Sequence, residues 1–178
     1  GMKNLAAAGA EYAALTGITP HIVFDELSKE SPIPVISMVD TARDYAVERG
    51  YKKICLLGTL PTMNGIFFQK SFAERGVEVV TPNEEEKNYI GRKIETELEF
   101  GKVLPETQKE FKRIAERIIR EENVQAVVLG CTELPLIFAG DYTEGLLAPK
   151  GHLDICAGEG EEIAYPTSML WQDNGLIC

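Results

Sequence analysis

The stretch VVLGCTELPLIF, residues 127–138, passes from an apolar run directly into a glycine, a thiol, a hydroxyl and a carboxylate. A short apolar run without polar interruption is typical of a parallel strand that is buried on both faces. The second apolar run, LPLIF, indicates that a helix begins after the polar residues. We therefore predict that Cys131, Thr132 and Glu133 lie at the carboxyl end of a buried strand.

The chain before this stretch alternates between strand-like and helix-like patterns. We predict strands over residues 11–15, 31–39, 52–59, 77–82 and 125–133. We predict helices over residues 2–9, 22–27, 39–50, 62–76, 84–100 and 105–122. Strands that alternate with helices imply right-handed crossovers and parallel pairing. The predicted fold class is therefore α/β with a parallel sheet.

The length and composition are those of an ordinary globular chain. With 178 residues, of which 44% are hydrophobic and 26% charged, the chain suits one domain or two small lobes. Its formal net charge of -10 argues against a nucleic-acid partner, because phosphate binding depends on Lys and Arg. An anionic small molecule is compatible with this charge, since a local cleft can carry the opposite field.

Four cysteines, at positions 55, 131, 156 and 178, stand far apart in the sequence. They form no CxxC pair and no zinc-like spacing with histidine, so we expect no bound metal. Cys55, inside a predicted strand, is expected to be a core residue. The chain has no apolar run of about 18 residues and nothing that resembles a secretory signal. These features predict no membrane partner and a cytoplasmic location with reduced thiols.

Open parallel sheets bind ligands in the loops that follow the carboxyl ends of their strands. The loops in question span residues 16–21, 37–41, 58–65 and 130–135. Their hydroxyls and helix-start N–H groups suit a small carboxylate ligand. Cys131 is the candidate acid, base or nucleophile, because a helix start stabilises a thiolate; a cysteine that only fills space is an equal alternative. By default His21 is structural and Lys102 is a surface lysine.

Residues 127–138 strongly resemble the second active-site motif of the aspartate/glutamate racemase family. Three further segments resemble this family in order: SPIPVISMVD, KKICLLGTLPTMNGIFFQKSF and ELEFGKVLPETQKEF. The resemblance implies two flavodoxin-like α/β lobes with the substrate between them and no cofactor. It implies that this chain has a partial first lobe (1–37), a complete second lobe (38–139) and a C-terminal segment (140–178) that returns toward the first lobe. A partial lobe exposes a sheet edge that a partner subunit or the C-terminal segment would have to cover, and we expect a homodimer.

In such racemases two cysteines act on opposite sides of the substrate's α-carbon. The resemblance implies that Cys131 is the second of these acid/base residues. It implies a substrate-binding set of Thr19, His21, Thr59, Thr62, Lys102, Thr132 and Glu133, in which Thr59 and Thr62 help to hold the substrate carboxylates. The family's first motif reads Cys-Asn-Thr, a variable residue and His, whereas this chain has GITPH at 17–21. Gly17 therefore occupies the first-thiol position, and it has no side chain that could move a proton.

The leading hypothesis is an amino-acid racemase-like isomerase that acts on aspartate or glutamate through Cys131, with activity put in question by Gly17. A second hypothesis is a decarboxylase of substituted malonates, because an enzyme that makes its carbanion by losing carbon dioxide needs only one thiol. The third is a degenerate family member that binds a ligand without catalysis. A reactive, low-pKa Cys131 would favour the first two over the third.

Overall fold

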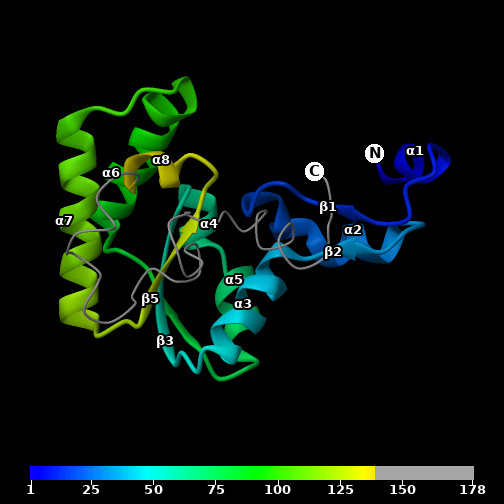
Figure 1. Cartoon of the computed structure of the whole chain (residues 1–178), viewed down its shortest axis with the longest axis horizontal. Coiled ribbons are helices and arrows are strands. Elements are labelled where there is room, and N and C mark those ends of the chain that lie inside the picture. The colour runs from blue at the N-terminus through cyan, green and yellow to red at the C-terminus, as the bar shows by residue number, and fades with distance from the viewer. Residues whose placement is uncertain (139–178) are drawn as a thin grey trace.

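The computed structural model describes residues 1–138 of the chain (Figure 1). Within them the strands form two separate parallel sheets, one of three strands and one of two. Helices follow the strands along the chain, which confirms the predicted α/β class. None of the helices in this part of the chain is both long and apolar enough to cross a bilayer. The segment 140–178, predicted to return toward the first lobe, lies outside the described residues.

The three-stranded sheet has β3 (Lys53–Gly58) at its centre, between β4 (Glu78–Val80) and β5 (Ala126–Gly130). β3 and β5 pair in parallel over five residues, from Ile54 with Ala126 to Gly58 with Gly130. Every residue of β5 is buried, as is every residue of β3 after Lys53. Burial on both faces explains why these strands read as unbroken apolar runs.

One face of this sheet is covered by α3 (Met38–Glu48) and α5 (Phe67–Ala73). The side chains that alternate to this face form a core with both helices, and they are Ile54, Leu56, Ala126, Val128, Met38, Val39, Ala42, Ala46, Phe68 and Phe72. The rings of Phe68 and Phe72 stack with their centroids 4.6 Å apart. This packing attaches α3, which directly follows the first sheet, to the second sheet.

The opposite face is covered by α4 (Leu60–Asn64), α6 (Glu84–Thr96), α7 (Pro105–Glu122) and α8 (Leu134–Phe138), as Figure 1 shows. The core here is larger, and it includes Cys55, Leu57, Val127, Leu129, Ile90, Ile94, Phe111, Ile114, Ile118 and Phe138. Cys55 is fully buried, as predicted, and desolvation raises the pKa of its thiol. Phe111, Ile114 and Ile118 are the apolar stripe by which α7 packs on the sheet.

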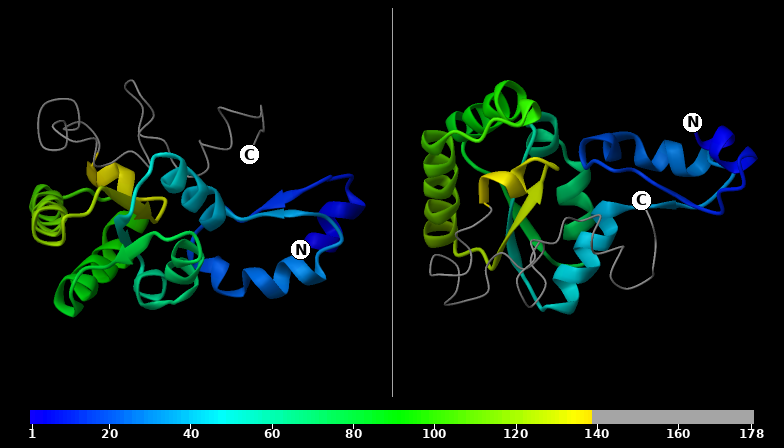
Figure 2. Two further views of the ribbon diagram at one scale, coloured as in Figure 1. Left: turned by 90° about the horizontal axis from the view of Figure 1, so that it is seen from below. Right: turned by 45° about the horizontal axis from the view of Figure 1, so that its top comes forward.

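The first 37 residues form a smaller unit that extends away from this sandwich (Figure 2). It consists of α1 (Met2–Ala7), β1 (Ala13–Ala14), the 3-10 helix η1 (Thr19–Val23), α2 (Phe24–Glu30) and β2 (Val35–Ile36). β1 and β2 pair in parallel over two residues each. Neither α1 nor α2 has a buried residue, so this unit has little core of its own.

The predicted and observed element boundaries differ at several places along the chain. The helix predicted over 62–76 is two helices, because Gly65 is extended (ψ 151°) and ends α4. Residues 16–21, predicted as a loop, already enter η1 at Thr19. The helix predicted over 84–100 ends at Thr96, and the 3-10 helix η2 (Leu98–Phe100) follows it. There the Glu97 carboxylate bonds to both Lys93 and Thr107.

Two paired glycines let the ends of β3 and β5 approach closely. A Cβ atom on Gly130 would lie 2.9 Å from the Leu57 carbonyl oxygen, and one on Gly58 would lie 3.0 Å from the Gly130 carbonyl oxygen. The Cγ2 methyl of Thr62 fills the remaining space, and it lies 3.1 Å from where a Cβ atom on Gly58 would stand. A larger residue at either glycine would have to displace backbone.

We expect Gly130→Ala to lower the free energy of unfolding by about 1–3 kcal/mol, because the new Cβ would meet the Leu57 carbonyl oxygen as well as Leu56 Cδ1, both at 2.9 Å. Urea unfolding measures the loss. Gly17→Ala is the matched control, since its Cβ would first meet Pro20 Cδ at an ordinary 3.5 Å. Equal stability of the two variants would contradict the close approach described for β3 and β5.

Candidate functional site

The candidate site begins where β3 and β5 end. Since Gly58 pairs with Gly130, Thr59 and Cys131 leave the sheet side by side at its carboxyl edge. Thr59 is the N-cap of α4, and its hydroxyl oxygen accepts a hydrogen bond from the Thr62 N–H at 3.3 Å. The sequence prediction that these two loops meet at one edge of the sheet is thereby confirmed.

A cluster of three threonine hydroxyls lies at this edge. Thr19 Oγ1, from η1, lies 2.9 Å from Thr59 Oγ1 and 2.8 Å from Thr62 Oγ1. The Thr59 hydroxyl donates to Thr62 Oγ1 at 3.0 Å, which closes the triangle. Thr62 is fully buried, and Thr19 and Thr59 are half-buried. Residues about 40 positions apart in the sequence are thus brought into mutual contact.

Cys131, Thr132 and Glu133 form a second group directly after β5. The Cys131 thiol donates to Glu133 Oε2 at 2.9 Å, and the Thr132 hydroxyl donates to the same oxygen at 2.7 Å. Cys131 and Glu133 are half-buried, whereas Thr132 is exposed. One carboxylate oxygen therefore accepts two hydrogen bonds, one from the thiol and one from the neighbouring hydroxyl.

The prediction of a stabilised thiolate at Cys131 is wrong for this arrangement. Burial and the hydrogen bond to the Glu133 carboxylate raise the pKa of Cys131 to about 12, and the backbone N–H of Glu133 lowers it only in part. α8 begins three residues later, at Leu134, and has five residues, so its N-terminus is not at the thiol. Cys131 is consequently a protonated thiol at neutral pH.

Two carboxylates affect the pKa of this thiol. Although burial opposes it, the hydrogen bonds from Cys131 and Thr132 hold the pKa of Glu133 below its ordinary value, so Glu133 is ionised. The charge of Glu99, in η2, also raises the pKa of Cys131. Sequence analysis did not single out Glu99, and its position three residues before Lys102 was the available signal.

His21 is buried between the first unit and α3. Its Nδ1 atom lies 3.0 Å from the Gly17 carbonyl oxygen and 3.2 Å from that of Ile18. Its Nε2 atom accepts a hydrogen bond from the Met38 N–H at 3.1 Å. Both ring nitrogens are therefore engaged by backbone groups, and desolvation holds the pKa of His21 below 6.5.

The other predicted positions are more open. Lys102 is exposed and lies two residues after η2, the element that carries Glu99. A Cβ atom on Gly17 would lie in ordinary contact with Pro20 Cδ at 3.5 Å, so the position has room for a Cβ. Ser37, the N-cap of α3, and Asp40, in the first turn of α3, are engaged with each other and with Arg43: Ser37 Oγ accepts from the Asp40 N–H, and Asp40 pairs with Arg43.

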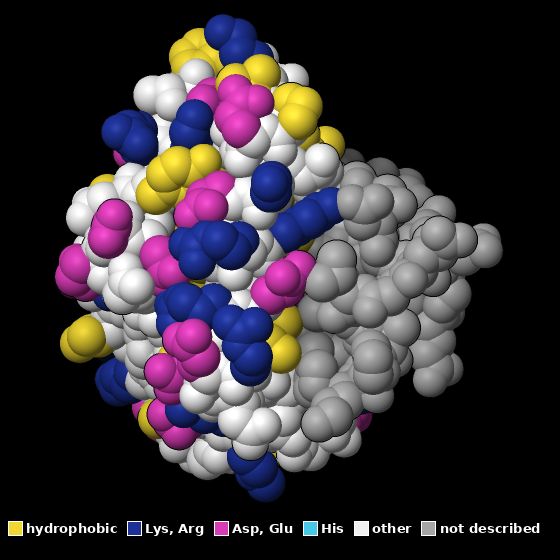
Figure 3. Space-filling view, turned by 90° about the vertical axis from the view of Figure 1, so that its left-hand side faces the viewer, with side chains coloured by type: hydrophobic (Ala, Val, Ile, Leu, Met, Phe, Trp, Pro, Cys, Tyr) yellow, Lys and Arg dark blue, Asp and Glu magenta, His cyan; other side chains and the backbone are white. Residues whose placement is uncertain are grey.

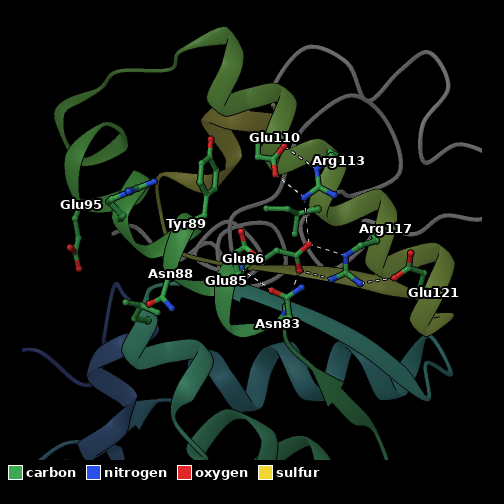
Figure 4. A pocket seen from close by; sticks show the side chains of 13 residues that line it. Asn83, Glu85, Glu86, Asn88, Tyr89, Glu95, Glu110, Arg113, Arg117 and Glu121 are labelled. Atoms are coloured by element: carbon green, nitrogen blue, oxygen red, sulfur yellow. Dashed lines mark hydrogen bonds and ion pairs between the residues drawn. The ribbon is translucent and has the colours of Figure 1, made fainter.

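A separate hollow of about 940 Å³ lies between α6 and α7 (Figure 4). Glu86 projects into it from α6 and is held by Arg117 at 2.8 Å and by the N–H of its own helix cap. Figure 3 shows that acidic and basic side chains interleave over this side of the molecule. Its lining includes Leu60, the first residue of α4, but none of the three clustered threonines and neither Cys131 nor Glu133, so we do not assign it to the candidate site.

The described residues contain no group of three or more His, Cys, Asp or Glu side chains placed to hold a metal ion. The chemistry available at the carboxyl edge of the sheet consists of a thiol, a carboxylate and clustered hydroxyls. Such a set can bind a carboxylate by hydrogen bonds and can transfer a proton.

A sequence model of the family described as Asp/Glu/hydantoin racemase matches residues 1–147. The chain belongs to this family. It is 41% identical to an aspartate racemase homologue from Pyrococcus horikoshii OT3, with a TM-score of 0.69 over 76% of this chain and 59% of that one. It is 29% identical to a putative Asp/Glu racemase from Yersinia pestis, also with a TM-score of 0.69, over 75% of this chain and 58% of that one.

The fold also resembles that of the glutamate racemase isoform RacE1 from Bacillus anthracis. The TM-score is 0.63 at 20% identity, over 97% of this chain and 62% of that one. This racemase-family chain thus spans less than two thirds of the length of each of these three relatives.

We expect Glu133→Gln to lower the pKa of Cys131 from about 12, because the variant removes the charge that opposes the thiolate. Ultraviolet absorbance of the thiolate against pH measures it, in a background in which Cys156 and Cys178 are replaced by Ser. Thr132→Val is the control, since it keeps the carboxylate. An unchanged titration in Glu133→Gln would contradict the described contact.

We expect Thr62→Val to lower the free energy of unfolding by about 1 kcal/mol, because a buried hydroxyl with two hydroxyl partners is lost at nearly constant volume. Thr96→Val is the matched control: Thr96 is exposed and bonds only to the Arg92 carbonyl in its own helix. Urea unfolding of both variants checks the difference. Equal losses would mean that the threonine cluster contributes no net stability.

Proposed function

We propose that this chain carries an amino-acid racemase-like isomerase site for small acidic amino acids, with Cys131 as its acid/base residue and no cofactor. The observation that carries the proposal is the hydrogen bond from the Cys131 thiol to Glu133, at the same sheet edge as the three threonine hydroxyls. Family membership and the printed names of the solved relatives, aspartate and glutamate racemases, support a racemase-like reaction.

The threonine cluster suits a carboxylate of the substrate. Thr19, Thr59 and Thr62 bond to one another, and each hydroxyl can turn its proton toward an acceptor that carries more charge. A hydrogen bond to a charged acceptor is about twice as strong as one between neutral groups. A carboxylate would therefore compete well for these donors. We assign Thr132 and Lys102, both exposed, to the second carboxylate of the ligand.

Glu133 is the proposed first acceptor in proton transfer. Its Oε2 atom accepts the hydrogen bond of the thiol, with 2.9 Å between sulfur and oxygen, and transfer of that proton to Glu133 leaves a thiolate on Cys131. This transfer is unfavourable in the free chain, because the pKa of Cys131 is raised to about 12 and that of Glu133 is lowered, so the bound substrate must favour it. The thiolate then removes the α-proton of the amino acid, and the electron pair of the broken C–H bond stays on the α-carbon. When Cys131 returns a proton to the same face, the original enantiomer is restored.

Inversion needs a second acid on the other face of the α-carbon. Gly17 occupies the first-thiol position of the family motif, and it cannot supply that proton. The chain by itself is therefore proposed to exchange the α-proton of one enantiomer without converting it to the other.

The homodimer and the cytoplasmic location expected from the sequence stay predictions.

We expect this chain, incubated in deuterated water, to replace the α-proton of one enantiomer of aspartate or glutamate with deuterium. Mass spectrometry measures the exchange, and chiral chromatography checks that the enantiomer is retained. Cys131→Ser is the matched variant and should lose the exchange. No exchange with either enantiomer of either amino acid at high protein concentration would overturn the proposal.

The Gly17→Cys variant extends the same experiment. The position has room for the side chain, and the variant restores a thiol at the first-motif position. If the missing acid is what prevents inversion, Gly17→Cys should convert the exchanged enantiomer into its mirror image, and Gly17→Ser should do so far more slowly. Exchange without inversion in Gly17→Cys would contradict this explanation.

A further inference from the structure

The His21 side chain connects the loop that precedes η1 to the start of α3. It is 4% exposed, and its ring stacks on Phe24 of α2 with the centroids 5.2 Å apart. One edge of the ring meets the carbonyl oxygens of Gly17 and Ile18, and the other meets the N–H of Met38, the first residue of α3. The resemblance to the family implies a ligand role, but neither nitrogen is open to a ligand in this structure.

These contacts determine which ring nitrogen carries the proton. Because Nε2 accepts from the Met38 N–H, it must be unprotonated, and because Nδ1 meets two carbonyl oxygens, it must be the donor. The ring is thus a neutral Nδ1–H tautomer. A second proton on Nε2 would place two donors, Nε2–H and Met38 N–H, against each other.

The two sides of this ring connect the candidate site to the large sheet. Gly17 and Ile18 immediately precede Thr19, whose hydroxyl bonds to Thr59 and Thr62. On the other side, Met38 begins α3, which packs on the sheet. The first N–H groups of a helix have no partner within the helix, and His21 supplies one from another segment.

We propose that His21 is the positioning residue of this site: as a neutral ring it holds the Thr19 loop against α3, and its protonation releases that loop. The released loop withdraws the Thr19 hydroxyl from the carboxylate-binding cluster. This consequence for ligand affinity depends on the function proposed above, whereas the ring's tautomer and its effect on stability do not.

Few charges act on this ring. α3 contributes Asp40, which raises the pKa of His21 but is itself paired with Arg43, and α2 carries Asp25 and Glu26 in its first turn. Desolvation outweighs these effects, so the pKa in the folded chain lies below the ordinary 6.5. The folded state therefore binds fewer protons than the unfolded state. The stabilisation is complete above pH 6.5 and is lost as the pH falls below it.

The first test is ligand affinity against pH. Isothermal titration calorimetry with aspartate or glutamate, from pH 7.5 down to the pH at which NMR shows the His21 ring protonated, should show the wild-type affinity fall by roughly fivefold or more, the equivalent of one buried hydrogen bond. Glu133, whose pKa is held low, stays ionised over this range. His21→Gln keeps an acceptor near Nε2 but does not titrate, so its affinity should stay flat.

The sequence offers a matched control, because it contains only two histidines. His152→Gln should keep the wild-type pH dependence, which assigns the effect to His21. His21→Asn, which keeps a donor near Nδ1, should be as flat as His21→Gln. If either His21 variant lost affinity at acid pH as the wild type does, the proposal would be overturned.

The second test needs no ligand. Long-range ¹H–¹⁵N NMR of the two imidazole rings should show His21 as the Nδ1–H tautomer at pH 7.5, and urea unfolding should show wild-type stability falling below pH 6.5 more than that of His21→Gln. An Nε2–H tautomer, or an equal pH dependence of stability in the wild type and His21→Gln, would overturn the proposal. If no ligand binds at any pH but these results hold, only the proposed function fails.

Discussion

The parallel pairing of Gly58 with Gly130 is the contact on which the rest of the structure depends. Without side chains, the ends of β3 and β5 lie close enough for Thr62 to pack over both. This brings the turn after β3 and the turn after β5 to one edge of the sheet. The threonine cluster and the Cys131 group therefore share that edge because of backbone geometry, before any polar side chain contributes.

The site is assembled from two different kinds of contact. Cys131, Thr132 and Glu133 are neighbours in sequence, and their hydrogen bonds follow from one tight turn. Thr19, in contrast, reaches Thr59 and Thr62 only because Ile18 is buried in the α3 core and His21 bonds to Met38. In the function proposed above, the local half is the reacting group and the distant half is the binding group, which depends on how the first unit attaches to α3.

Sequence patterns predicted the elements well where burial was uniform. β3 and β5 are apolar runs with both faces covered, and α7 has an unbroken apolar stripe, so period and position agree with the structure. The patterns failed where a single residue interrupted an element that the periodicity of its neighbours predicted to continue. Gly65 split a predicted helix, and another left α-helical geometry at Glu97 (φ -125°), whose carboxylate bonds to Lys93 and Thr107. Such side-chain contacts are not visible in periodicity.

Neighbouring residues were enough to predict the α/β class, the family and the groups at the candidate site, because strand and helix periods and the GCTE motif are properties of adjacent residues. The chemical state of these groups depends on contacts that the fold creates. Cys131 is a protonated thiol rather than a thiolate, since burial and the Glu133 carboxylate outweigh the nearby N–H group. His21 is a neutral link between two segments, since its partners lie 4 and 17 residues away. Protonation depends on which groups surround an atom in space, and the linear order of residues does not contain that information.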